Sequence, residues 1–313
     1  MDTTEQEEEK EIVHGEKGKK SHAKKKTITI GVIAILLIII GCAIGWLYTG
    51  SVIPAKEKVF NYLPLPAAIV DMNFVSANKV ISRINLQKQL ADAQGLGVEV
   101  NATDTFDQLL ESKKIEALAN KYRLKVEKAE LDEEYNNIVK QYANGDENSF
   151  KVELEKTYAM TPDEFKNDVI RQELLQSQLV LWYNSQEDLN KDAYAKVKAL
   201  QDKLANGQSI EDIIKAYSED ENLKDFAGDS GMISFDDLLP EFRKSLQDAK
   251  KDEIKFVVSR YGLHILKVLD TNNDGENGAK QIHLKQVYQK TEGFQKWLLE
   301  QSDNVRVIKL LKF

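Results

Sequence analysis

The sequence predicts an α+β protein in which one transmembrane helix is followed by a helical domain and then by a domain that mixes helices and strands. Three observations indicate this fold class. Residues 27–48 form an uncharged apolar run, residues 104–182 show the apolar spacing of helices, and the chain after residue 188 alternates short helices with β-branched stretches. With 313 residues the chain has room for two domains of ordinary size.

Composition and motifs exclude several classes of protein. The formal net charge of −8 gives no reason to expect a nucleic-acid partner. Cys42 is the only cysteine, so no disulfide can form within the chain. The sequence also lacks CxxC and HExxH patterns, and a zinc site would therefore have no ligands. We expect a protein without metal or cofactor.

The apolar run at residues 27–48, "TITIGVIAILLIIIGCAIGWLY", predicts a membrane anchor. About 22 residues in a helix span roughly 33 Å, which is enough to cross the hydrocarbon core. The basic cluster "KGKKSHAKKK" (Lys17 to Lys26) precedes it and should stay in the cytoplasm, which places everything after Tyr48 outside. A cleaved signal peptide and a lipoprotein lipidated at Cys42 are the alternatives. The length of the run favours an uncleaved single-pass anchor.

The first 26 residues are predicted to form a disordered cytoplasmic tail. An acidic run, "EQEEEKE", comes before the basic cluster, and such a segment has little apolar surface to bury.

Residues 49–189 are predicted to form the helical domain. The stretch "AAIVDMNFV" at 67–75 has the composition of a strand. Thr105 is expected to cap a first helix, and a second helix should begin near Leu131 and end at the Asn-Gly pair in "ANGDENS". In "TPDE" (Thr161 to Glu164) an N-cap, a first-turn proline and a capping-box glutamate open a long helix.

Three segments of this helical region occur in a recognisable order: "LLESKKIEALA", "AELDEEYNNI" and "TPDEFKNDVIRQELL". They resemble the N-terminal region of the SurA/PrsA/PpiD-type foldases. The resemblance implies a helical chaperone domain that holds unfolded polypeptides. A generic helical bundle without this kinship is the alternative.

Residues 190–293 are predicted to form the second domain. Ser209 and Asp212 form a capping-box-like helix start, and Pro240 opens another helix at its first turn. The stretch "IKFVVSRYGLHILKVLD" gives two strands joined through Gly262.

Three blocks between Asp192 and Asp270 resemble the parvulin family of peptidyl-prolyl isomerases. They read "LANGQSIEDIIKAYSED", "AGDSGMISFDDLLPEF" and "RYGLHILKV". The resemblance implies an FKBP-like α+β domain that catalyses rotation about X-Pro bonds. The family's first strand, of the form "x-H-I-L-V", is missing before the first helix, and "QIHLKQVY" follows the last strand instead. We therefore expect a circular permutation in which this strand pairs with its predecessor through a hairpin.

The segment "DTNNDGENGAKQ" (270–281) begins like a calcium-binding loop. Its twelfth residue is Gln281, which cannot supply the bidentate carboxylate of such a loop. We interpret the segment as the hairpin loop, with Asn, Asp and Gly suited to turn geometry.

The resemblance to parvulins also implies the site residues. A polar cluster would contain His264, His283, Asp220 and Ser259. Leu238, Phe242 and Met232 would form an apolar seat for the proline ring. In this hypothesis His264 and His283 lie in neighbouring strands and face each other. The alternative is purely structural: the histidines hold the sheet together, Asp220 caps a turn, and the apolar residues belong to the core.

The C-terminal segment is predicted to return to the helical domain. "GFQKWLLEQ" (293–301) has helical spacing, and "VRVIKLLKF" (305–313) is typical of a strand. We expect this strand to pair near residues 67–75, so that residues 294–313 complete the helical domain.

These expectations together predict a membrane-anchored isomerase and chaperone facing away from the cytoplasm. Its partners would be unfolded or proline-containing exported polypeptides. A holdase with an inactive parvulin domain and a membrane-anchored scaffold are the alternatives.

Overall fold

The computed structural model describes residues 36–93, 95, 99–158, 160–272 and 280–313. Residues 36–48 are helical, and the rest of the predicted anchor and the whole predicted tail lie outside the described residues. Within the described part of the chain, no helix has both the length and the apolar character that crossing a membrane requires.

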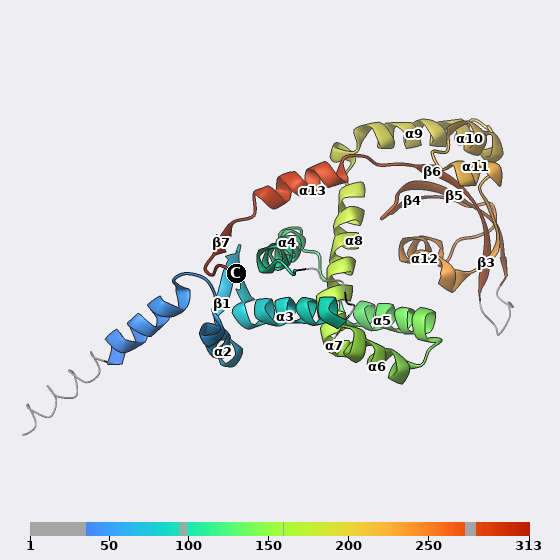
Figure 1. Cartoon of the computed structure of the whole chain (residues 1–313). Coiled ribbons are helices and arrows are strands. Elements are labelled where there is room, and N and C mark those ends of the chain that lie inside the picture. Colours follow the sequence, from blue (N-terminus) through green and yellow to red (C-terminus); the bar gives the residue numbers. More distant parts are fainter. Residues whose placement is uncertain (1–35, 94, 96–98, 159, 273–279) are drawn as a thin grey trace, which may run out of the picture.

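The first half of the chain is mainly helical, as the sequence predicts (Figure 1). Its helices are α2 (Pro54–Tyr62), α3 (Ala77–Ala93), α4 (Ala102–Lys121), α5 (Lys128–Ala143), α6 (Glu147–Tyr158), α7 (Pro162–Phe165), a π-helical turn (Lys166–Ile170) and α8 (Arg171–Asn184). The capping box at Thr161 and Glu164 is confirmed, with Pro162 in the first turn of α7. The prediction that Thr105 caps a helix is wrong, because the Asn101 side chain accepts the N–H groups of the first turn instead.

The predicted strand at 67–75 is a hairpin of two strands, β1 (Pro66–Val70) and β2 (Asn73–Ser76). Asp71 adopts a left-handed conformation with φ 53°, which reverses the chain in the middle of the β-branched stretch. The C-terminal strand β7 (Val307–Lys309) pairs antiparallel with β1 and completes a three-stranded sheet. The expected return of the C-terminus to this region is therefore confirmed.

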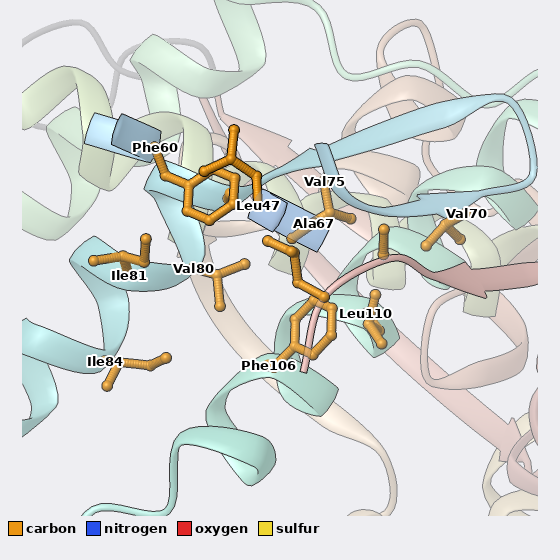
Figure 2. Close-up of a cluster of buried hydrophobic side chains, with 13 residues drawn as sticks. Leu47, Phe60, Ala67, Val70, Val75, Val80, Ile81, Ile84, Phe106 and Leu110 are labelled. Atoms are coloured by element: carbon orange, nitrogen blue, oxygen red, sulfur yellow. The ribbon is translucent and has the colours of Figure 1, made fainter. Parts of the chain in front are cut away.

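The first hydrophobic core joins segments from both ends of the chain. Leu47, Phe60 and Phe106 are buried together beside β1 and β2 (Figure 2), and Leu311 belongs to the same cluster. Phe313 stacks against Phe106 with 4.9 Å between ring centroids. Residues that are more than 200 positions apart in the sequence thus share one core.

The second half contains helices around a four-stranded sheet. Its helices are α9 (Lys191–Ala205), α10 (Ile210–Tyr217), α11 (Glu221–Asp225), α12 (Pro240–Leu246) and α13 (Phe294–Asp303), and its strands are β3 (Asp229–Ser234), β4 (Ile254–Ser259), β5 (Gly262–Asn272) and β6 (Gln281–Gln289). The strand order is β3-β6-β5-β4. Figure 1 shows α8 and α13 running between this sheet and the helical half.

Each face of this sheet covers its own apolar cluster. Leu263, Ile265 and Val287 pack with α9 and α10, whereas Leu266 and Leu284 pack with α12. Neighbouring residues of a strand point to opposite faces, and the two clusters follow this alternation.

Strands β5 and β6 form an antiparallel hairpin, as expected, with Asn272 opposite Gln281. The predicted loop residues 273–279 lie outside the described part of the chain. Strand β6 lies between β3 and β5, at the centre of the sheet. The circular permutation itself stays a prediction, because it is a statement about this chain relative to a family.

Candidate functional site

His264 lies at the centre of the candidate site, on the face of β5 that α12 covers. Its side chain is buried, with 3% of the residue exposed. Its Nε2 atom lies 2.7 Å from the Oγ of Ser259, the last residue of β4. Burial lowers the pKa of His264 to about 4, so the imidazole is neutral at physiological pH.

One ring nitrogen of His264 is left available. Among the described residues, Nδ1 has no hydrogen-bond partner although it is buried. The Oγ of Ser259 also accepts the backbone N–H of Tyr261, 3.0 Å away. Ser259 can donate its own proton to Nε2, and in that tautomer Nδ1 carries the ring proton. The site therefore holds a buried ring nitrogen without a partner among the described residues, and a bound ligand could use it.

Phe242 of α12 closes one side of the site. Its ring meets the His264 ring edge to face, with centroids 4.8 Å apart. Leu238 belongs to the same apolar cluster, and both residues are less than 8% exposed. Leu238 and Phe242 therefore lie in one buried cluster, and their role as a seat for a proline ring stays a prediction.

Tyr288 of β6 closes the other side, and it is not among the site residues expected from the sequence. It pairs with His264 across the strands, and the two rings lie 5.3 Å apart. Its hydroxyl donates to the backbone carbonyl of Tyr261 at 2.8 Å. Burial, together with the charges of Glu219 and Asp220, raises the pKa of Tyr288. The tyrosine is thus a protonated hydroxyl beside the imidazole.

Gly262 permits this close arrangement at the turn between β4 and β5. Its φ is 152°, and a Cβ there would lie 2.7 Å from the Gln289 carbonyl oxygen and 2.9 Å from the Tyr288 ring. A larger residue would push β6 away from β5 and separate Tyr288 from His264.

The prediction that His283 faces His264 is wrong. His283 pairs with Asp270 and Met232, well along the sheet from the pair formed by His264 and Tyr288. Because side chains alternate along a strand, His283 shares its face with Val287, on the side opposite to α12. The two histidines therefore lie at different positions along the strands and on opposite faces of the sheet.

His283 has a partner of its own. Its Nε2 lies 2.5 Å from Oδ1 of Asp229 in β3. The Gly231 N–H and then His283 lower the pKa of Asp229. Met232 lies beside His283, is 43% exposed, and points away from the face that carries Phe242. Met232 is therefore not part of the seat formed by Leu238 and Phe242, and the prediction that it would be is wrong.

Asp220 acts as the N-cap of α11. Its carboxylate accepts the backbone N–H of Asn222 at 2.9 Å and that of Leu223 at 3.4 Å. Its negative charge also acts on Tyr288, but no direct contact with His264 is observed. A catalytic role for Asp220 stays a prediction.

A groove of about 650 Å³ runs between the helical half and the isomerase-like half. The helices α5 and α8 form one wall, and residues 236–244 with Arg260 form the other. Leu238 belongs both to this second wall and to the apolar cluster that contains Phe242. The groove therefore borders the apolar cluster that contains Phe242.

Comparison with known proteins defines the class of this site. Residues 175–270 match the family model described as Rotamase: PPIC-type PPIASE domain. The matched range contains His264, Ser259, Phe242 and Leu238, and it ends before β6. The chain therefore carries a parvulin-type peptidyl-prolyl isomerase domain.

Several relatives extend this finding. Foldase protein PrsA 1 of Bacillus cereus is 38% identical over 24% of this chain and 27% of its own length. Chaperone SurA of Nitrosospira multiformis is 31% identical over 37% of this chain and 27% of its own length. Foldase protein PrsA 2 of Bacillus cereus is 28% identical over 62% of this chain and 67% of its own length. The chain thus spans only about a quarter of the first two of these relatives.

A crystal structure of the peptidylprolyl isomerase PrsA from Bacillus anthracis also matches, with 22% identity over 63% of this chain and 85% of that chain. Its TM-score of 0.22 is too low to indicate a shared overall arrangement.

Proposed function

We propose that this protein is a peptidyl-prolyl cis-trans isomerase and chaperone that assists the folding of exported proteins at the outer face of the cell membrane. The observation that carries the proposal is the match of residues 175–270 to the PPIC-type domain. Within that range, His264, Ser259 and Phe242 contact one another, and we assign the proposed reaction to this cluster.

The site suits a reaction that breaks no covalent bond. Rotation about an X-Pro bond has a barrier of about 18–20 kcal/mol, because the planar amide is stabilised by conjugation. An apolar seat between Leu238 and Phe242 would hold the proline ring, once these side chains move apart. The twisted amide nitrogen has lost its conjugation and can accept a hydrogen bond, and Nδ1 of His264 is one donor for it in the tautomer that protonates this atom. Contacts that are stronger for the twisted amide than for the planar one lower the barrier.

The chaperone part of the proposal rests on the helical half. The relatives are called foldase and chaperone, and we extend these roles to this chain. The helical half supplies one wall of the groove and also exposes large apolar side chains, including Tyr62 and Phe74. Such exposed apolar surface suits the binding of unfolded polypeptides.

The location outside the cytoplasm rests on the sequence alone. The apolar run at 27–48 follows a basic cluster, and this order favours a cytoplasmic N-terminus. An uncleaved single-pass anchor would then hold the two domains at the outer face of the membrane. Protease treatment of intact spheroplasts tests this orientation: residues 49–313 should be digested, whereas a tag on the N-terminus should be protected.

A prolyl-isomerase assay on the full-length chain tests the catalytic proposal. We expect acceleration of a proline-limited refolding reaction and a loss of at least about tenfold in His264→Ala, since a positioned polar group contributes at least this much in enzymes. Phe242→Ala should also lose activity, because it removes one side of the apolar seat. His283→Ala is the matched control, because this histidine lies on the opposite face of the sheet, and it should keep the parent's rate. Circular dichroism must show that all three variants are folded.

A holdase without isomerase activity is the second candidate function. The observation in its favour is the closed seat, in which Leu238 and Phe242 are both buried. If the parent shows no isomerase activity but still suppresses the aggregation of an unfolded client, this second function replaces the first.

A further inference from the structure

The groove between the two halves of the molecule combines an apolar floor with an acidic border. On the α8 side the floor consists of Leu174, Leu181 and Trp182, all half-buried. Leu238 and Leu239 form the floor on the opposite side. A polypeptide lying in the groove would contact these side chains and could place a proline next to Leu238.

Acidic side chains dominate the border of the groove. Six carboxylates line it, against three basic side chains. Two of the basic side chains are already in ion pairs: Arg243 with Glu133 and Arg260 with Glu241, each at 3.2 Å. The groove therefore presents a net negative field to a ligand.

The two carboxylates that directly precede Leu238 in the sequence are free to act on a ligand. Asp236 and Asp237 directly precede Leu238, and both are exposed. Among the described residues, neither carboxylate takes part in an ion pair. Glu134 faces them from α5 across the groove and likewise has no ion-pair partner in the described part of the chain. A positive charge beside a bound proline would thus meet carboxylates from both walls.

A second and independent observation comes from Glu241. Its side chain is only 9% exposed, and one oxygen, Oε1, pairs with Arg260. The other oxygen, Oε2, is buried without a hydrogen-bond partner among the described residues. A buried carboxylate oxygen without a donor is unfavourable, so a ligand that brings an N–H group would be stabilised there.

We propose that this groove selects proline-containing client segments that carry lysine or arginine beside the proline, and that it discriminates against acidic segments. This proposal rests on the proposed function, because it assigns the substrate class of the same site. The apolar floor holds the segment in place, and the carboxylates of Asp236, Asp237 and Glu134 attract a positively charged side chain beside the proline.

The test uses the full-length protein in a non-ionic detergent and three peptides of the form Ala-Ala-X-Pro-Phe, with X as Lys, Ala or Glu. Exchange between cis and trans proline is measured by NMR at catalytic protein concentrations. We expect the Lys peptide to have a catalytic efficiency about fivefold above that of the Glu peptide, the size that exposed ion pairs allow. This ratio should shrink towards one at about 1 M salt, where the Debye length is only about 3 Å.

Two double variants locate the effect. Asp236→Asn with Asp237→Asn should reduce the Lys-to-Glu ratio to less than about twofold, and lysine at both positions should reverse the order. Asp202→Asn with Asp303→Asn is the matched control. These two carboxylates are also exposed, but they do not line the groove, so the ratio should equal that of the parent.

Binding of the same peptides, measured by fluorescence anisotropy, separates this inference from the proposed function. If the parent catalyses nothing but still binds the Lys peptide more tightly, the isomerase proposal fails and the charge preference holds. If the parent isomerises all three peptides equally, or if the groove variants keep the parent's ratio, the charge preference is overturned and the isomerase proposal stands.

Discussion

At the scale of single residues, the buried imidazole of His264 links the candidate site to stability. Its pKa is about 4 in the folded protein and about 6.5 when exposed, so the unfolded chain binds the proton more readily between these values. The stability that follows from keeping His264 neutral is present above pH 6.5 and is lost as the pH falls towards 4. The two pKa values correspond to about 3 kcal/mol of unfolding free energy.

Urea unfolding of the parent and of His264→Gln at pH 7.5 and pH 4.5 measures this loss. The parent should lose more stability than the variant on acidification, by up to about 3 kcal/mol, because glutamine does not titrate. The carboxylates titrate in both proteins, and their contribution to the loss of stability cancels when the parent is compared with the variant. An equal loss of stability in the parent and in His264→Gln would contradict the low pKa of His264 in the folded protein.

The same scale shows what the sequence could predict about the site. His264, Ser259 and Phe242 meet because each lies in a short motif whose local structure is fixed by Gly262 or Pro240. The partner of His264 depends on strand register instead. His264 lies seven residues before Thr271, and a hairpin centred on the polar segment 271–280 places its partner seven residues after Lys280, at Val287, one residue before Tyr288. Counting from the centre of the loop therefore comes within one residue of the tyrosine, and the register shift between Val268 and Asp270, which sets the exact pairing, could not be predicted from the sequence.

At the scale of elements, the C-terminal end of α8 is fixed to the isomerase sheet by Asn184. The side chain is buried, donates through Nδ2 to the carbonyl of Ser259 at 2.9 Å, and accepts from the hydroxyl of Thr291 at 2.7 Å. Asn184→Ala should destabilise the protein by about 1–3 kcal/mol, because the buried Ser259 carbonyl loses its donor. Asn136→Ala on the exposed side of α5 is the control, and it should change stability by less than about 0.5 kcal/mol.

Denaturant unfolding compares the two asparagine variants, and the proline-isomerisation rate gives a second readout. Ser259 hydrogen-bonds His264, so the loss of its anchor should also reduce catalysis. A variant at position 184 that unfolds like the parent would show that this contact does not hold α8 to the sheet. This network could not be predicted from the sequence, because nothing in the sequence distinguishes Asn184 from the other asparagines near helix ends.

Local signals did predict most elements. Pro162 and Pro240 mark helix starts because proline is favoured in a first turn, and both helices begin there. The stretch 67–75 was harder, since its composition indicates a strand throughout and the reversal depends on a single aspartate with positive φ. A turn carried by one such residue leaves little trace in β-propensity.

At the scale of the whole molecule, the helical half is built from both ends of the chain. Leu311 is 2% exposed in the first core, and β7 pairs with β1. The four-stranded sheet of β3 to β6 is therefore inserted in the sequence between two parts of the helical half. The helical half can reach its full stability only after the C-terminal residues have been added to it.

Leu311→Ala tests this dependence. Removing a buried leucine side chain leaves a cavity, and we expect a loss of about 2–5 kcal/mol of unfolding free energy. Leu299→Ala is the matched control in the same C-terminal segment: Leu299 is 65% exposed, so its removal should cost less than about 0.5 kcal/mol.

Hydrogen exchange then shows which half of the molecule loses stability in Leu311→Ala. The amides of β1 and α4 should exchange faster in Leu311→Ala, whereas those of β5 and β6 should keep the parent's protection, because their strands pair within the other sheet. Faster exchange in both sheets alike would show instead that the two halves unfold as a single unit.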